Sequence, residues 1–221
     1  MGPPSNVMNM MYLHGWASGP GSAKGRLLAA ALATRGVPLT VPNLNCPAFE
    51  QLTYTGALSA ISEAAALGTD RWNLVGSSMG GYLAARWAEL HPERVNRLVL
   101  LCPGFDLLER LPIVFRDPNL YERWEREGCF SPGYGPDGPS SRISFDFVAD
   151  ARLYPARPRI KHPTLILHGV ADNVIPLASS QLAACEHPEC VQLVELEDGH
   201  DLVGVASSGI SELTMRWLGV G

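Results

Sequence analysis

The stretch Trp72-Asn73-Leu74-Val75-Gly76-Ser77-Ser78-Met79-Gly80-Gly81 carries the strongest structural signal in this sequence. Its first four residues are typical of a short buried strand, and Met79 begins a segment with helical spacing that continues to Leu90. The two glycines of the Gly-x-Ser-x-Gly pattern leave room for a sharp turn between strand and helix. Such a turn exposes its central serine at the tip, so we predict Ser78 as a nucleophile. The side chain of its neighbour Ser77 is expected to point elsewhere.

Outward from this turn, short apolar strands alternate with helices along most of the chain. The further expected strands cover Val7–Leu13, Leu39–Val41, Val95–Leu101, Thr164–Leu167 and Val191–Leu196. The further expected helices cover Lys24–Thr34, Thr55–Leu67, Leu177–Cys185 and Val205–Leu218. This alternation predicts an α/β fold with a mostly parallel sheet of about six strands and helices on both faces.

One segment, Pro103–His162, breaks the alternation and is rich in proline, glycine and aromatic residues. A structureless loop of this length is improbable inside a compact domain. We therefore predict a small cap with short helices at about residues 104–160, inserted after the fourth strand. The alternative is a surface excursion whose aromatic side chains pack on the sheet. The chain of 221 residues is long enough for one sizeable core and short for two, so residues 1–221 are expected to form a single domain.

A serine hydroxyl is a poor nucleophile at neutral pH and needs a base, which in turn needs an orienting acid. His200, in the stretch Glu197–Asp201 after the last expected strand, is the expected base. Asp172, just past the strand Thr164–Leu167, is the expected acid. These two residues and Ser78 each follow a different strand, and the carboxyl ends of parallel strands meet at one edge of a sheet.

Other residues of the same types remain as alternatives. Asp106, after the fourth strand, is a rival acid, whereas Asp198 and Asp201 are expected to serve turn geometry or helix capping. The remaining histidines are expected to orient loops or to lie at the surface and at element ends. They are His14, His91, His162, His168 and His187.

Attack on a carbonyl also requires donors that stabilise the oxyanion. One expected donor is the backbone N–H of Met79, because it follows the nucleophile at the start of a helix. The second is expected from the loop Leu13–Pro20 after the first strand, and we assign it to the backbone N–H of Trp16. The alternative for this loop is a plain glycine-rich turn.

The residues identified so far resemble the α/β-hydrolase superfamily, in which nucleophile, acid and base occur in this order along the chain. The stretch His14–Pro20 continuing to Lys24, together with Gly76–Tyr82, is similar to the small bacterial esterases of the YqiA-like group. It also resembles the mitochondrial acyl-protein thioesterases of the same superfamily. The resemblance implies the α/β-hydrolase fold, a triad of Ser78, Asp172 and His200, and an oxyanion hole at Trp16 and Met79. It further implies activity on carboxylic esters or thioesters without a cofactor.

The bulk composition excludes several other classes of protein. The net charge of −5, with no basic cluster, argues against binding of nucleic acid, and no apolar run reaches the length of a membrane span. The N-terminal stretch is not a secretory signal, and five cysteines in no framework fit reduced thiols, so we expect a cytoplasmic protein. Cys185, His187 and Cys190 lie close in sequence, but no second ligand pair stands at zinc spacing, and we expect no metal site.

The sequence therefore predicts hydrolysis of a small carboxylic ester, with a short to medium acyl chain, through an acyl-enzyme. The same residues could serve a thioesterase, a carbon–carbon hydrolase, a lyase or a peptidase, because fold does not fix chemistry. A non-catalytic binding module on the same scaffold is a further alternative. The protein is expected to be a monomer or a homodimer.

Overall fold

A computed structural model describes residues 8–68, 71–203 and 207–220 of the chain. Its main sheet has six strands in the order β2-β1-β3-β4-β7-β8, and each neighbouring pair runs parallel. The strands are β1 (Asn9–Leu13), β2 (Leu39–Thr40), β3 (Trp72–Ser77), β4 (Val95–Leu101), β7 (Thr164–Gly169) and β8 (Val191–Leu196). The predicted parallel sheet of six strands is confirmed.

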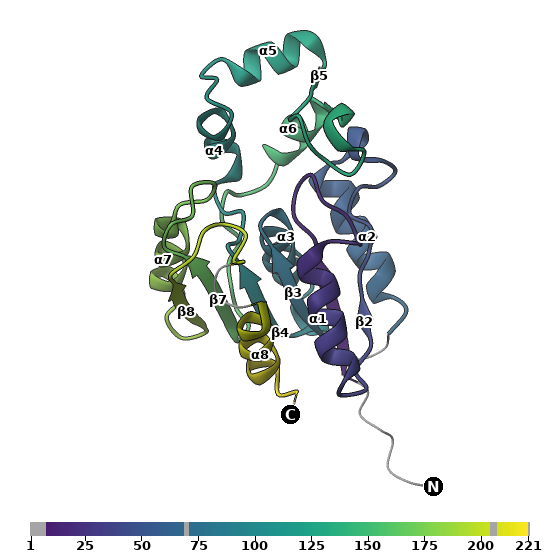
Figure 1. Ribbon diagram of the computed structural model, residues 1–221, viewed down its shortest axis with the longest axis vertical. Helices are drawn as coiled ribbons and strands as arrows, with labels where there is room; N and C mark the ends of the chain where they lie inside the picture. Colours follow the sequence, from purple (N-terminus) through teal and green to yellow (C-terminus); the bar gives the residue numbers. More distant parts are fainter. Residues whose placement is uncertain (1–7, 69–70, 204–206, 221) are drawn as a thin grey trace, which may run out of the picture.

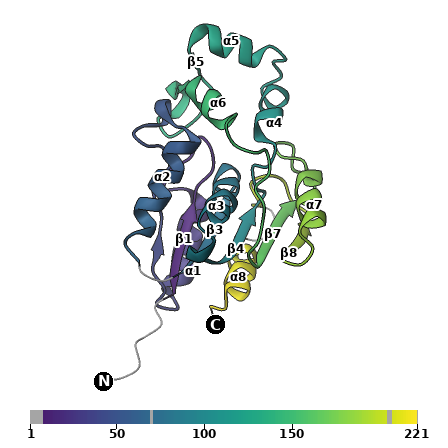
Figure 2. The same ribbon diagram turned by 180° about the vertical axis from the view of Figure 1, so that it is seen from behind.

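Helices cover both faces of this sheet (Figures 1 and 2). Two of them, α1 (Ala23–Ala33) and α8 (Ser207–Leu218), contact each other on one face. The opposite face packs against α2 (Tyr54–Ala65), α3 (Met79–Leu90) and α7 (Leu177–Glu186). Every residue of β3 and β7 is buried, which explains why these strands lack the alternation of a half-exposed sheet.

The register of the strands brings their carboxyl ends together. Leu13 at the end of β1 pairs with Gly76 of β3, and Gly76 pairs in turn with Leu100 of β4. On the far side of β4, Leu101 pairs with Leu167 of β7. The residues that follow these strands therefore share one edge of the sheet, where an open α/β sheet forms its binding site.

Element bounds differ from the predicted ones mainly at the ends. Strands β3 and β7 are each two residues longer than expected, because the backbone pairing continues into the polar and glycine residues after the apolar run. The expected first residue of β1, Val7, and the expected first residue of α8, Val205, lie outside the described residues.

The segment after β4 contains several short elements beyond the carboxyl end of the sheet (Figure 1). They are α4 (Leu107–Val114), α5 (Leu120–Glu127), β5 (Cys129–Phe130), η3 (Gly138–Ser140), β6 (Ile143–Ser144) and α6 (Asp146–Ala151). Elsewhere in the described residues lie the short 3₁₀ helices η1 (Phe49–Gln51) and η2 (Pro92–Arg94).

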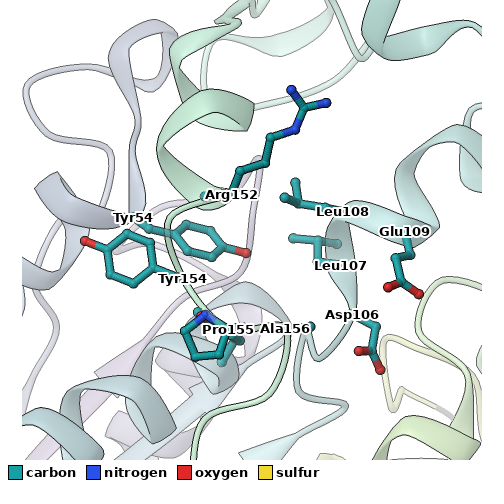
Figure 3. Close-up of a pocket in the computed structure, with 12 residues that line it drawn as sticks. Tyr54, Asp106, Leu107, Leu108, Glu109, Arg152, Tyr154, Pro155 and Ala156 are labelled. Carbon is teal, nitrogen blue, oxygen red and sulfur yellow. The ribbon is translucent and has the colours of Figure 1, made fainter.

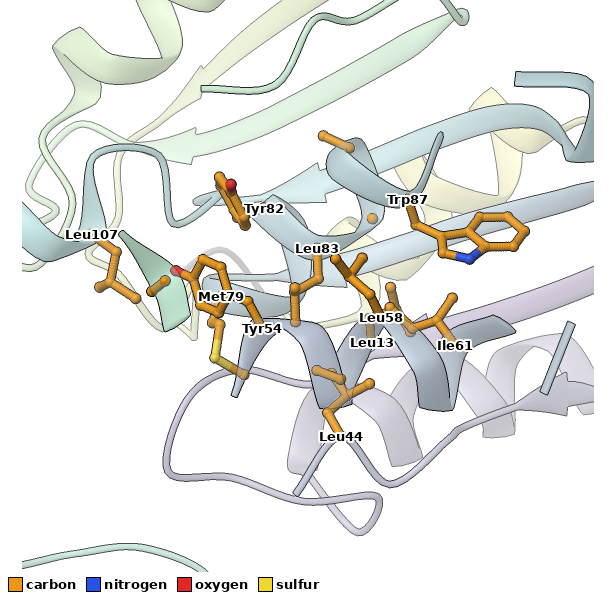
Figure 4. Packing of buried hydrophobic residues seen from close by; sticks show 14 of the residues in the cluster. Leu13, Leu44, Tyr54, Leu58, Ile61, Met79, Tyr82, Leu83, Trp87 and Leu107 are labelled. Atoms are coloured by element: carbon orange, nitrogen blue, oxygen red, sulfur yellow. The ribbon is translucent and has the colours of Figure 1, made fainter. Parts of the chain in front are cut away.

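Aromatic side chains attach this segment to the rest of the protein. Phe105, Trp124 and Phe147 are fully buried and belong to the same core cluster as Leu13 and Met79. Figure 4 shows part of this cluster, in which the rings of Tyr54 and Tyr82 pack against each other at a centroid distance of 4.9 Å. None of the helices in the described ranges combines the length and the apolar character that a bilayer crossing requires.

Candidate active site

Ser78 occupies a strained turn between β3 and α3. Its φ angle is +53°, a left-handed conformation that costs free energy for any residue except glycine. Backbone hydrogen bonds link the turn to the end of β4 and the loop after it, from the Ser78 N–H to the Leu101 carbonyl (2.9 Å) and from the Gly104 N–H to the Ser78 carbonyl (2.7 Å). The surrounding structure thus holds the Ser78 side chain at the edge of the sheet.

Alanine at position 76 or 80 is expected to destabilise the protein by about 3 kcal/mol or more, because no flexible side chain can yield to the added methyl group. The new Cβ would lie 2.3 Å from the Gly80 carbonyl oxygen in Gly76→Ala and 2.2 Å from the Leu13 carbonyl oxygen in Gly80→Ala. Gly19→Ala is the matched control, since nothing lies within 4 Å of its Cβ. Urea unfolding measures the difference; equal stability of Gly80→Ala and Gly19→Ala would contradict it.

Ser78, His200 and Asp172 form one continuous chain of hydrogen bonds. The Nε2 atom of His200 lies 3.0 Å from the Ser78 Oγ, and its Nδ1 atom lies 2.7 Å from the Asp172 Oδ2. The three residues stand 122 and 28 positions apart in sequence, and the strand register brings them together. This arrangement allows His200 Nδ1–H to donate to the carboxylate while Nε2 accepts the proton of the serine hydroxyl.

The carboxylate of Asp172 has no exposed surface and is fully provided with donors. Its Oδ1 accepts the backbone N–H groups of Val174 (2.8 Å) and Ile175 (2.9 Å), and its Oδ2 also lies 3.3 Å from the Nε2 of His168. Burial by itself would raise the pKa of Asp172, but the hydrogen bonds from His168, His200 and Ile175 hold it well below its usual range. Asp172 is therefore ionised at neutral pH.

This lowered pKa makes Asp172 a source of acid sensitivity. An unfolded aspartate has a pKa near 3.9, so its stabilisation is complete above roughly pH 5. It is lost as the pH falls through the lowered folded-state pKa, because only the unfolded chain takes up a proton in that window. Between pH 5 and pH 3, the wild-type protein should lose more unfolding free energy than Asp172→Asn. Urea titrations of both proteins at the two pH values measure this, and equal losses would contradict it.

His168 contacts the Asp172 carboxylate, a contact that the sequence did not predict. Its imidazole is completely buried, with Nδ1 2.8 Å from the Ser180 Oγ and Nε2 3.1 Å from the Ile175 carbonyl. The expected role, orientation of its own loop, therefore extends to the Asp172 carboxylate. Its position four residues before Asp172, at the end of a strand, was the available signal.

The rival acids have other partners. Asp106 pairs with Arg157 at 2.7 Å and lines a smaller cavity of about 160 Å³, across from Tyr54 and Tyr154 (Figure 3). Asp198 accepts the Gly199 N–H at 2.7 Å. Asp201 faces the Lys24 ammonium at 3.8 Å.

The other histidines have structural contacts away from Ser78. His14 is buried and its Nε2 accepts the Leu44 N–H at 3.1 Å, while its Nδ1 lies 3.0 Å from the Gly15 carbonyl. His162 contacts the Pro92 carbonyl at 2.9 Å.

A cavity of about 720 Å³ opens in front of Ser78 and His200. One part of its wall is apolar and includes Trp16, Leu111 and Phe115. The Trp16 ring packs edge-on against Phe115 and Tyr134, at centroid distances of 5.9 and 6.2 Å. The loop after β1 passes close to Ser78, because a Cβ on Gly15 would lie 3.4 Å from the Ser78 Cβ. Met79, which follows Ser78 in the chain, is the first residue of α3. Its backbone N–H therefore has no hydrogen-bond acceptor within the helix.

Metal-ligand atoms gather at one place in the described part of the chain. The Sγ of Cys102 and ligand atoms of His168 and Asp172 lie within 4.8 Å of one another. Burial raises the pKa of the Cys102 thiol to about 12, and the other two side chains are engaged in the hydrogen bonds above. The hydrogen bonds of His168 and Asp172 to each other and to their neighbours explain why these side chains lie together in the core. The group considered from sequence, Cys185, His187 and Cys190, is a different set.

The profile of an uncharacterised protein family, UPF0227, matches residues 9–129, which is more than half of the chain. The chain belongs to the UPF0227 family. The matched residues include the loop after β1 and the turn around Ser78, the two stretches on which the resemblance to YqiA-like esterases rested. That resemblance is confirmed.

This UPF0227 chain is also similar to characterised and solved proteins. It is 32% identical over 145 residues to the 2-hydroxymuconate semialdehyde hydrolase of Pseudomonas sp. (strain CF600), covering 52% of the chain and 50% of that enzyme. The chain spans about half the length of the curated relatives it matches.

Among solved structures, a putative hydrolase from Agrobacterium vitis S4 has a TM-score of 0.76 at 20% identity, covering 96% of this chain and 88% of that one. Est1E from Butyrivibrio proteoclasticus, with ferulic acid bound, has a TM-score of 0.71 at 16% identity, covering 96% and 90%. The UPF0227 chain therefore has the α/β-hydrolase fold.

Proposed function

We propose that this protein is a serine hydrolase that cleaves carboxylic esters through an acyl-enzyme. The observation that carries the proposal is the hydrogen-bonded chain from Asp172 through His200 to Ser78, which opens on a cavity of about 720 Å³. A buried ionised carboxylate at one end and an accessible hydroxyl at the other are what nucleophilic acyl transfer requires.

In the proposed reaction, the Ser78 Oγ attacks the carbonyl carbon of the ester as His200 Nε2 takes the hydroxyl proton. Asp172 holds the imidazole in the required tautomer and stabilises the imidazolium that forms. The backbone N–H groups of Met79 and Trp16 stabilise the oxyanion. Collapse of the tetrahedral intermediate expels the alcohol, to which His200 returns the proton. Water, deprotonated by His200, then releases the acid and restores Ser78.

The segment at about residues 104–160 is proposed to act as the cap of a single domain. Leu111, Phe115 and Tyr134 from this segment join Trp16 in the cavity wall. An apolar wall of this kind fits an acyl chain or alcohol of modest size, and Est1E, which shares the fold, binds ferulic acid.

Cleavage of a carbon–carbon bond by the same residues is the second candidate. It is favoured by the curated relative from Pseudomonas, whose name gives a semialdehyde and not an ester as its substrate. A thioester would require no change in the proposed steps.

The test combines labelling with a substrate panel. A fluorophosphonate probe should label the wild-type protein at Ser78, and para-nitrophenyl esters should be hydrolysed faster than acyl-CoA thioesters or ketone substrates of matched length. Faster turnover of the ketone substrates would favour the second candidate. If the wild-type protein takes up no label and turns over no substrate of the panel, it is not a serine hydrolase.

A further inference from the structure

The cavity in front of Ser78 has a polar region that the proposed reaction does not use. Its wall there includes Tyr12, Ser22, Lys24 and Ser77. The Tyr12 hydroxyl interacts with the hydroxyls of Ser22 and Ser77, so these side chains form one connected group. Ser77 directly precedes the proposed nucleophile and is itself buried.

Lys24 gives this region a positive charge. Its ammonium donates to the Ser77 Oγ at 3.3 Å, and its side chain is 23% exposed. Among the described residues that line the cavity, it is the one lysine or arginine. An ammonium has three donors, so the bond to Ser77 leaves others for a ligand.

Two aspartates, Asp198 and Asp201, also line the cavity, and Asp201 pairs with Lys24 only weakly. Its carboxylate lies 3.8 Å from the Lys24 ammonium, beyond hydrogen-bonding distance, and its side chain is 80% exposed. Ion pairs of this kind contribute little, because water screens them. An anion bound deeper in the cavity would be better shielded from water and would interact more strongly with the same ammonium.

We propose that Lys24 binds an anionic group, a carboxylate, on the substrate, with the hydroxyls of Ser22 and Ser77 beside it. The proposal rests on the proposed function, because it assigns a substrate class to the same cavity. The substrate is then an ester that combines an apolar portion, against Trp16 and Phe115, with a carboxylate near the scissile bond. Lys24 is a specificity-determining residue, and Asp201 competes with the substrate for it.

Two pairs of esters test the proposal, each differing in one charge. The para-nitrophenyl half-ester of hexanedioic acid and its methyl-capped counterpart place the charge on the acyl side. The compound para-acetoxybenzoate and its methyl ester place it on the leaving group. The readout is the ratio of kcat/KM for the charged ester to that for the capped ester, and at least one pair should show a ratio that depends on Lys24.

Lys24→Gln should lower that ratio by about 10-fold or more, mainly through KM, because a hydrogen bond to a charged group is lost. Lys24→Arg should retain most of the preference, and Asp201→Asn should raise the ratio by removing the competing carboxylate. Salt should weaken the wild-type preference. The chain has one other lysine, Lys161, which is exposed before β7 at the opposite end of the sheet. Lys161→Gln is therefore the matched control and should leave the ratio unchanged.

Fluorophosphonate labelling separates the failure of this proposal from the failure of the proposed function. Suppose that the wild-type protein takes up the label and hydrolyses esters. If Lys24→Gln then changes neither ratio of kcat/KM values, or if Lys161→Gln changes a ratio by the same factor, Lys24 does not bind the carboxylate of the substrate. A uniform loss for charged and capped esters alike would assign Lys24 to support of the Ser78 turn and overturn the proposal. If wild-type protein neither labels nor turns over, the proposed function itself is wrong.

Discussion

Ser78→Ala is expected to lower kcat for ester hydrolysis on the order of 10⁶-fold, with little change in KM. The variant removes the Oγ that lies 3.0 Å from His200 Nε2, so no acyl-enzyme can form. The methyl group of alanine fits the same backbone conformation, and the substrate still contacts the unchanged cavity wall. Measurement requires steady-state kinetics with a para-nitrophenyl ester and a fluorophosphonate label, which the variant should not take up.

Ser77→Ala is the matched control for that substitution. Its hydroxyl is buried and accepts a hydrogen bond from Lys24, and it does not contact His200 in the described structure. A loss of at most about 100-fold is expected, because the lost hydrogen bond comes from the charged Lys24 ammonium and lies outside the reacting atoms. Comparable losses in both variants would show that the turn as a whole, and not one hydroxyl, limits the reaction.

Asp172→Asn is expected to lower kcat by about 10⁴-fold while leaving the fold intact. The amide oxygen of asparagine can still accept the N–H groups of Val174 and Ile175, which Asp172 Oδ1 accepts now. Its amide NH₂ would then face His200 Nδ1, which lies 2.7 Å from Oδ2 in the wild-type protein. A donor at that position favours the tautomer with the proton on Nε2, which cannot accept the proton of Ser78.

The control for this prediction is Asp106→Asn, since Asp106 is the rival acid from the sequence. It pairs with Arg157 in a different cavity, so kcat should stay close to the wild-type value. Thermal unfolding of both variants identifies any general loss of structure. If kcat falls about 10⁴-fold in Asp106→Asn and stays near the wild-type value in Asp172→Asn, the acid is Asp106.

The sequence predicted the sheet well because its strongest signals are local. Apolar runs of strand length, a glycine-bounded turn and helical spacing after Met79 each depend on neighbours within a few residues. The apolar pattern predicts that β3 and β7 end two residues before they do. Backbone pairing continues there through residues with no apolar side chain. The elements between β4 and β7 were not predicted individually, since proline and glycine interrupt the periodicity and long-range aromatic packing stabilises them.

By itself, the sequence determined the α/β fold and the set of candidates Ser78, Asp172 and His200, because each of these follows a strand and parallel strands share one carboxyl edge. Only the tertiary structure decided which side chains meet there. In the folded protein Asp172 contacts His200 and Asp106 pairs with Arg157, although both aspartates follow strands. It also brought His168 to Asp172 and Lys24 to Ser77, 53 residues away, contacts that depend on strand order and register rather than on any local pattern.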